Sequence, residues 1–98
     1  MTANYTGFFY ASYAVYLAAR QPERLLLVTK WLYPEVAKRY ATTWECVERD
    51  IRTIIRVAWD THPAMLEQVT RHPLSRRPKT SKFLATLALS FSFEPPVQ

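Results

Sequence analysis

Four charged residues recur on one face of a predicted helix near the middle of the chain. They are Glu45, Arg49, Arg52 and Arg56, and their spacing of i, i+4, i+7 and i+11 places them in one stripe. An arginine fork donates two parallel hydrogen bonds to guanine O6 and N7, or it clamps a phosphate. The stripe therefore indicates a surface that reads bases in the major groove of duplex DNA.

The acidic residues of the same helix fit this interpretation, because Glu45 and Glu48 can accept hydrogen bonds from cytosine N4. The alternative is a solvated face held by Glu45–Arg49 and Glu48–Arg52 ion pairs, each of which stabilises a helix by only about 0.2–0.5 kcal/mol. We favour base reading, because the three arginines directly follow a signal for the start of a helix.

A second basic segment spans residues 71–82 and contains no acidic residue. It comprises Arg71, Arg76, Arg77, Lys79 and Lys82. If this segment flanks the predicted reading helix, it can clamp the sugar-phosphate backbone, which positions a protein but reads no sequence. A basic loop without a ligand is an equally weighted alternative.

Catalytic and metal-binding chemistry finds little support in the sequence. His62 and His72 lie in predicted loops, and Cys46 is the only cysteine that could join them, which is a poor pattern for zinc. Cys46 itself is predicted in the first turn of a helix, where the helix dipole can lower the pKa of its thiol. We favour the alternative that it is simply a small residue near the DNA-facing surface. The single glycine excludes a glycine-rich nucleotide loop. We therefore predict a protein that is not an enzyme and has no catalytic residue, metal site or cofactor.

Composition and charge set the class of protein. A chain of 98 residues, 49% of them hydrophobic, is enough for one compact domain, which we place at 1–98 with a frayed tail from about 92. Residues 38–82 hold ten Lys or Arg and five Asp or Glu, so this half of the chain carries the whole net charge of +5. A polyanionic partner is therefore expected there.

The first nineteen residues are uncharged, but Asn4, Thr6, Ser12 and four tyrosines interrupt them. A membrane-spanning helix needs roughly 20 predominantly apolar residues, and no basic region precedes this stretch as in a signal peptide. We therefore expect a core helix and no membrane segment. The single cysteine favours the reducing cytoplasm.

Apolar periodicity and the positions of the prolines predict an all-α bundle of about six helices. The predicted helices are 8–20, 22 to about 32, 34–41, 43–60, 63–70 and 81–91. The second begins near Pro22 and carries Leu25, Leu26, Val28 and Leu32. The fourth carries an apolar ladder opposite the charged stripe, formed by Val47, Ile51, Ile54, Ile55 and Ala58.

The helices at 34–41 and 43–60 form a predicted helix-turn-helix. Ala37 is small enough to let the second helix approach, and Val47 is expected to face the core beneath the turn. Thr42 and Glu45 have the spacing of a capping box, which marks a helix start. Asp50 stands where the commonest form of the motif has an apolar residue, so the turn is predicted to be one residue longer than usual.

The chain resembles the C-terminal effector domain of stage-zero sporulation protein A, the response regulator of bacterial sporulation. The matching motifs are Leu32-Tyr-Pro-Glu-Val-Ala-Lys38, Thr42-Thr43, Val47-Glu-Arg49, Ile51-Arg52 and Val57-Ala-Trp59. The resemblance runs from about Gly7 to Trp59 and resumes from Pro78 to Phe83, after a connection shorter than that of the family.

The resemblance implies that the fourth helix enters the major groove of a promoter box. It also implies binding as adjacent copies on tandem boxes and contact with an RNA polymerase sigma factor. The residues that match the base-reading face are Glu48, Arg49, Arg52 and Thr53. For contacts with the DNA backbone we predict Arg56, Arg77, Lys79, Lys82 and Thr43, of which Lys79 lies in the family's matching basic stretch.

Several positions depart from the family. Glu45, Cys46 and Thr53 replace residues of other types, so a different DNA sequence is expected, and Arg20-Gln-Pro22 interrupts the region between the first two helices. The family also carries an N-terminal receiver domain. We therefore expect either an excised domain or a standalone relative without a phosphorylation switch.

One rival hypothesis comes from a different class of protein. The aromatic first helix, with Tyr10, Tyr13 and Tyr16, suits a helical interaction module. Such a module would pair with a full-length relative and modulate it without reading DNA itself. A binding titration with duplex DNA separates the two hypotheses.

Overall fold

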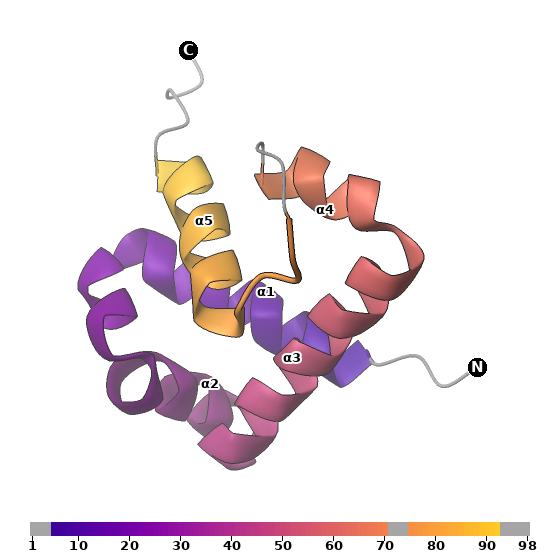
Figure 1. The fold of residues 1–98 in the computed structure, drawn as a ribbon. Coiled ribbons are helices and arrows are strands. Elements are labelled where there is room, and N and C mark those ends of the chain that lie inside the picture. Colours follow the sequence, from indigo (N-terminus) through magenta and orange to yellow (C-terminus); the bar gives the residue numbers. More distant parts are fainter. Residues whose placement is uncertain (1–4, 71–74, 93–98) are drawn as a thin grey trace.

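The computed structural model describes residues 5–70 and 75–92, and no strand occurs in these ranges (Figure 1). Its α-helices are α1 (Tyr5–Arg20), α2 (Tyr33–Arg39), α3 (Trp44–Thr61), α4 (Pro63–Thr70) and α5 (Thr80–Ser92). The predicted all-α fold is confirmed, with five α-helices rather than about six.

The missing helix is the one predicted from residue 22. That segment forms a 3-10 helix, η1 (Pro22–Leu27), followed by a π-helical turn, η2 (Val28–Leu32). Its apolar residues do not form one inward-facing stripe: Leu26 is 75% exposed, whereas Leu32 is fully buried. The Arg24 guanidinium donates a hydrogen bond to the carbonyl of Trp31 at 2.6 Å and ties the two turns together. The prediction of a regular α-helix here was therefore wrong.

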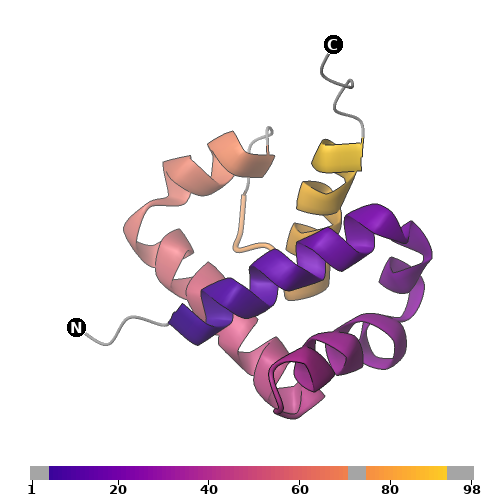
Figure 2. The same cartoon turned by 180° about the vertical axis from the view of Figure 1, so that it is seen from behind.

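Helix α1 is the central element of the fold. It crosses the back of the molecule and packs against both α3 and α5 (Figure 2). Its inner face is made largely of small side chains, since Ala11, Ala14 and Ala18 are all buried. Small side chains let α3 and α5 approach α1 closely, so α1 fixes the positions of these two helices.

Helix α3 approaches α1 closely at Gly7, the only glycine in the chain. A Cβ atom at this position would overlap the backbone carbonyl oxygen of Asp50 and lie 2.9 Å from Cγ2 of Ile54. Only glycine therefore fits this crossing, and the crossing fixes α3 against α1.

The inner face of α3 faces the core as predicted. Val47 and Ile51 are fully buried, Ile55 is nearly so, and Ile54 and Ala58 are partly buried against the same cluster. The largest fully buried side chains in the core come from four elements: Leu32, Tyr33, Val36, Val47, Ile51 and Leu84. Because one side of α3 packs against these elements, its opposite side faces outward.

Candidate nucleic-acid interface

Helices α2 and α3 form the predicted helix-turn-helix. Ala37 and Val47 are 5% and 0% exposed and face the core. Between the helices, Ala41 adopts a left-handed conformation with φ of 55°, and the Thr42 amide donates a hydrogen bond to the Ala37 carbonyl at 2.9 Å. These features reverse the chain and hold the start of α3 against the end of α2.

The cap of α3 is one residue later than predicted. The hydroxyl of Thr43 accepts a hydrogen bond from the backbone amide of Cys46 at 3.3 Å. The third helical position is therefore Cys46, and Glu45 makes no reciprocal bond of a capping box. The prediction that Thr42 caps the helix was wrong, because its backbone closes the turn instead.

Hydrogen bonds from Thr43 and, to a smaller extent, Thr42 lower the pKa of the Cys46 thiol.

The outer face of α3 carries the predicted charged stripe. The side chains of Arg49 and Arg52 are 61% and 54% exposed, and Glu45 and Arg56 are exposed as well. Thr53 lies beside this stripe and is partly buried. Its hydroxyl donates a hydrogen bond to the carbonyl of Arg49 at 2.9 Å. Its methyl group and oxygen lone pairs remain for a contact with a base.

The arginines of the stripe are only loosely held. Nη1 of Arg52 lies 3.6 Å from Oε1 of Glu48, and Nε of Arg49 lies 3.5 Å from Oδ1 of Asp50. Of the two ion pairs considered in the alternative interpretation, Glu48–Arg52 forms and Glu45–Arg49 does not, because Arg49 pairs with Asp50. Exposed ion pairs of this kind contribute about 0–1 kcal/mol, so an incoming base or phosphate can replace them at little cost.

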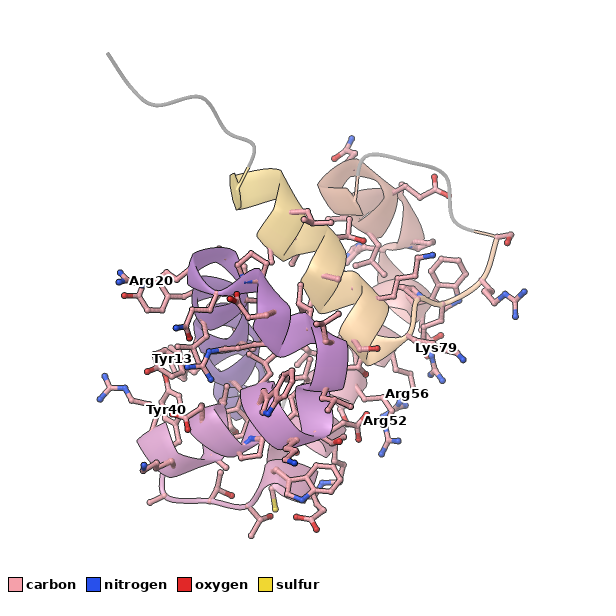
Figure 3. The ribbon with its side chains drawn as sticks, turned by 90° about the vertical axis from the view of Figure 1, so that its left-hand side faces the viewer. Tyr13, Arg20, Tyr40, Arg52, Arg56 and Lys79 are labelled. Atoms are coloured by element: carbon pink, nitrogen blue, oxygen red, sulfur yellow. The ribbon has the colours of Figure 1, made fainter. Side chains whose placement is uncertain are left out.

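A cleft of about 570 Å³ separates α3 from the basic segment before α5. Glu48 and Arg52 line one wall, and Arg76, Arg77 and Lys79 line the other. The basic segment therefore flanks α3. This is the arrangement that contacts between the segment and the sugar-phosphate backbone of DNA require. Figure 3 shows Lys79 on the same side of the molecule as Arg52 and Arg56. Lys82 is exposed but does not line the cleft, and Arg71 lies outside the described residues.

Two aromatic residues, Trp44 and Tyr33, also line the cleft, and neither was identified as a site residue from the sequence. Trp44, the first residue of α3, is 37% exposed and lies one helical turn before Glu48 on the same face. Tyr33 lines the inner end and is almost fully buried. Burial, with a smaller contribution from the charge of Glu48, raises the pKa of Tyr33 to about 12, so its hydroxyl stays neutral. Trp44, Glu48 and Arg52 are four residues apart, so they lie along one face of α3. This spacing is the sequence signal that could have identified Trp44 as a residue of the cleft wall.

In the described part of the chain, no group of three or more His, Cys, Asp or Glu side chains is placed to hold a metal ion. No helix in the same ranges combines the length and apolar character that crossing a bilayer requires.

In a comparison with protein families, the model described as the C terminal of sporulation initiation factor Spo0A matches residues 1–91. The match therefore includes the helix-turn-helix, the cleft and all but the last residue of α5.

Proposed function

We propose that the chain is a transcription regulator that reads a promoter box with α3. It belongs to the family of Spo0A C-terminal domains. The family is the DNA-binding effector domain of sporulation regulators. The observation that carries the proposal for this chain is the exposed arginine stripe of α3 beside a basic cleft wall.

In this proposal two groups of residues have different roles. Glu48, Arg49, Arg52 and Thr53 read base edges, because they lie on the outer face of α3. Arg56, Arg77, Lys79, Lys82 and Thr43 hold the sugar-phosphate backbone on either side of the groove. The Thr43 hydroxyl can serve both as helix cap and as a donor to phosphate, since a hydroxyl accepts and donates.

The family resemblance extends the proposal to partners. Adjacent copies bind tandem boxes in the cytoplasm, and the bound protein contacts an RNA polymerase sigma factor. No catalytic step, metal ion or cofactor enters this mechanism.

The test is a titration against promoter-derived and random duplexes at several salt concentrations. If about four phosphates are neutralised, log K falls with log salt at a slope of roughly −3 to −4. The promoter-derived duplex is expected to bind more tightly than the random one at every salt concentration. A slope near zero, or no binding at low salt, contradicts the proposal.

A second candidate function is supported by the exposed aromatic residues of α1. Phe8, Phe9 and Tyr16 are each at least 51% exposed, although large apolar side chains are usually buried. In this alternative, the chain pairs with a full-length relative and modulates it without reading DNA. Co-sedimentation with the relative and no duplex binding is the result that favours this alternative.

A further inference from the structure

A continuous strip of aromatic rings and guanidinium groups runs along α1 and the end of α2. We call it the tyrosine–arginine strip and define it as Tyr13, Tyr16, Arg20, Arg39 and Tyr40. The Arg20 guanidinium lies 5.5 Å from the centre of the Tyr16 ring, which stacks on Tyr13 at 5.9 Å. Arg39 lies 5.8 Å from the Tyr13 ring and 5.9 Å from the Tyr40 ring. Two sequence-distant helices thus build one surface.

The strip rests on a buried support. Tyr10 is 5% exposed, and its ring packs against Tyr40 with a centroid distance of 5.3 Å. Tyr40 in turn meets the edge of Tyr13 at 6.1 Å. Because Tyr10 belongs to the core, the rings of the strip are held in place before any partner arrives. Pre-organised side chains lose less conformational entropy when they bind.

The two arginines of the strip carry charge that no described carboxylate offsets. The ion pairs found within residues 5–70 and 75–92 both lie on α3, and neither includes Arg20 or Arg39. Arg20 donates one hydrogen bond, from Nη1 to the Tyr16 hydroxyl at 3.1 Å. A guanidinium that lies over a ring keeps N–H groups at its edge, and these match a carboxylate in a two-pronged hydrogen bond.

The position of the strip decides between classes of partner. Figure 3 shows Tyr13, Arg20 and Tyr40 at one edge of the molecule, and Arg52, Arg56 and Lys79 at the opposite edge. The two sets of labelled residues therefore lie toward different sides of the molecule, which favours for the strip a partner other than the duplex on α3. Tyr and Arg are also, together with Trp, the residue types enriched among those that dominate the binding energy of protein interfaces.

We infer that the tyrosine–arginine strip is a docking surface for an acidic segment of another protein. Carboxylates of that segment pair with Arg20 and Arg39, and an aromatic or aliphatic side chain between them packs on Tyr13 and Tyr16. This inference goes beyond DNA binding and does not depend on it, because the two surfaces share no residue.

The test uses a fluorescently labelled synthetic peptide, Asp-Glu-Tyr-Asp-Glu-Leu, and the whole chain. The double variant Arg20→Gln/Arg39→Gln is expected to bind the peptide at least tenfold more weakly than the unmodified chain. The matched control is Arg49→Gln/Arg56→Gln, which removes the same charge from α3 and is expected to bind the peptide nearly as well as the unmodified chain. Circular dichroism confirms that both variants are folded.

Two further measurements sharpen the result. Arg39→Lys keeps the charge but removes the fork, so it is expected to weaken peptide binding several-fold. Saturation of α3 with duplex DNA is expected to leave peptide binding unchanged. The inference is overturned by an equal loss in both double variants, by the absence of saturable binding at low salt, or by displacement of the peptide by DNA. It is also overturned if the strip variant loses DNA affinity, because the strip then belongs to the DNA surface.

Discussion

Arg52 belongs both to the outer stripe of α3 and to the wall of the cleft, where it contacts Glu48. Its guanidinium is more than half exposed and is restrained only by this exposed ion pair. Arg77 and Lys79, in contrast, come from a non-helical segment on the opposite wall. The two walls of the cleft are therefore suited to different tasks: the first to reading bases and the second to holding phosphates.

We predict that Arg52→Ala costs about 1–3 kcal/mol of binding free energy on the cognate site and much less on random duplex, because a base contact is lost. Lys79→Ala is the matched comparison from the other wall. It is expected to weaken both duplexes alike and to reduce the salt slope by about one, because a phosphate contact is lost. Fluorescence anisotropy at matched salt measures both variants. An equal loss on both duplexes for Arg52→Ala shows that α3 is not the reading helix.

A second prediction at the scale of residues concerns Tyr33. In the unfolded chain a tyrosine ionises near pH 10, whereas burial and the charge of Glu48 raise the pKa of Tyr33 in the folded chain to about 12. Above pH 10 the unfolded state therefore loses this proton first, and the free energy of unfolding falls as the pH rises towards 12.

Removing the hydroxyl group isolates this contribution from those of the other tyrosines and the lysines. Between pH 9 and pH 11.5, the free energy of unfolding of the unmodified chain is expected to fall about 2 kcal/mol further than that of Tyr33→Phe. Urea unfolding at a series of pH values measures the difference. Parallel curves would show that Tyr33 ionises equally easily in both states.

At the scale of elements, local patterns predicted most of the helices. The helix at α3 was predicted well because an apolar ladder and a charged stripe lie on opposite sides of the same 3.6-residue period. Residues 22–32 were mispredicted, because several leucines in a row satisfy a helical pattern without specifying which face is buried. The exposure of Leu26 and the burial of Leu32 are decided by packing against other elements.

The cleft could be predicted only in part. Its two walls and its inner end come from residues 28–33, 44–52 and 76–81, and tertiary packing alone brings them together. The sequence identified the charged residues of both walls, because their charge patterns are local. It did not identify Tyr33, whose position depends on the irregular turns of η1 and η2. The tyrosine–arginine strip was missed for the same reason, since Arg39 and Tyr40 meet α1 only in the fold.

The start of α3 gives a prediction at the scale of elements. Thr43→Ala removes the side-chain acceptor of the Cys46 amide and is expected to lower the free energy of unfolding by about 1 kcal/mol. Thr42→Ala, the neighbouring control, is expected to lower it by less than about 0.5 kcal/mol, because Thr42 closes the turn through its backbone. Thr43→Ser keeps the cap and serves as a second control. Thermal or urea unfolding ranks the three variants. A larger loss of stability for Thr42→Ala than for Thr43→Ala would show that Thr42 caps the helix, as in a capping box.

At the scale of the whole molecule, two functional surfaces are proposed at opposite edges of one bundle. The arginine stripe and the cleft lie at one edge, and the tyrosine–arginine strip lies at the other (Figure 3). Helix α1 connects them, because it packs against α3 near Gly7 and carries three residues of the strip in its C-terminal half. A regulator built in this way can hold DNA and a protein partner at the same time.

The last prediction concerns self-association. The chain carries a net charge of +5, which disfavours contact between free copies. Bound DNA offsets this repulsion and places copies side by side, so we expect a monomer in free solution and adjacent pairs on a duplex with tandem boxes. Sedimentation velocity with and without that duplex measures both states, and a duplex with a single box is the control. A tight dimer without DNA would contradict this expectation and indicate an interface built on the exposed rings of Phe8, Phe9 and Tyr16.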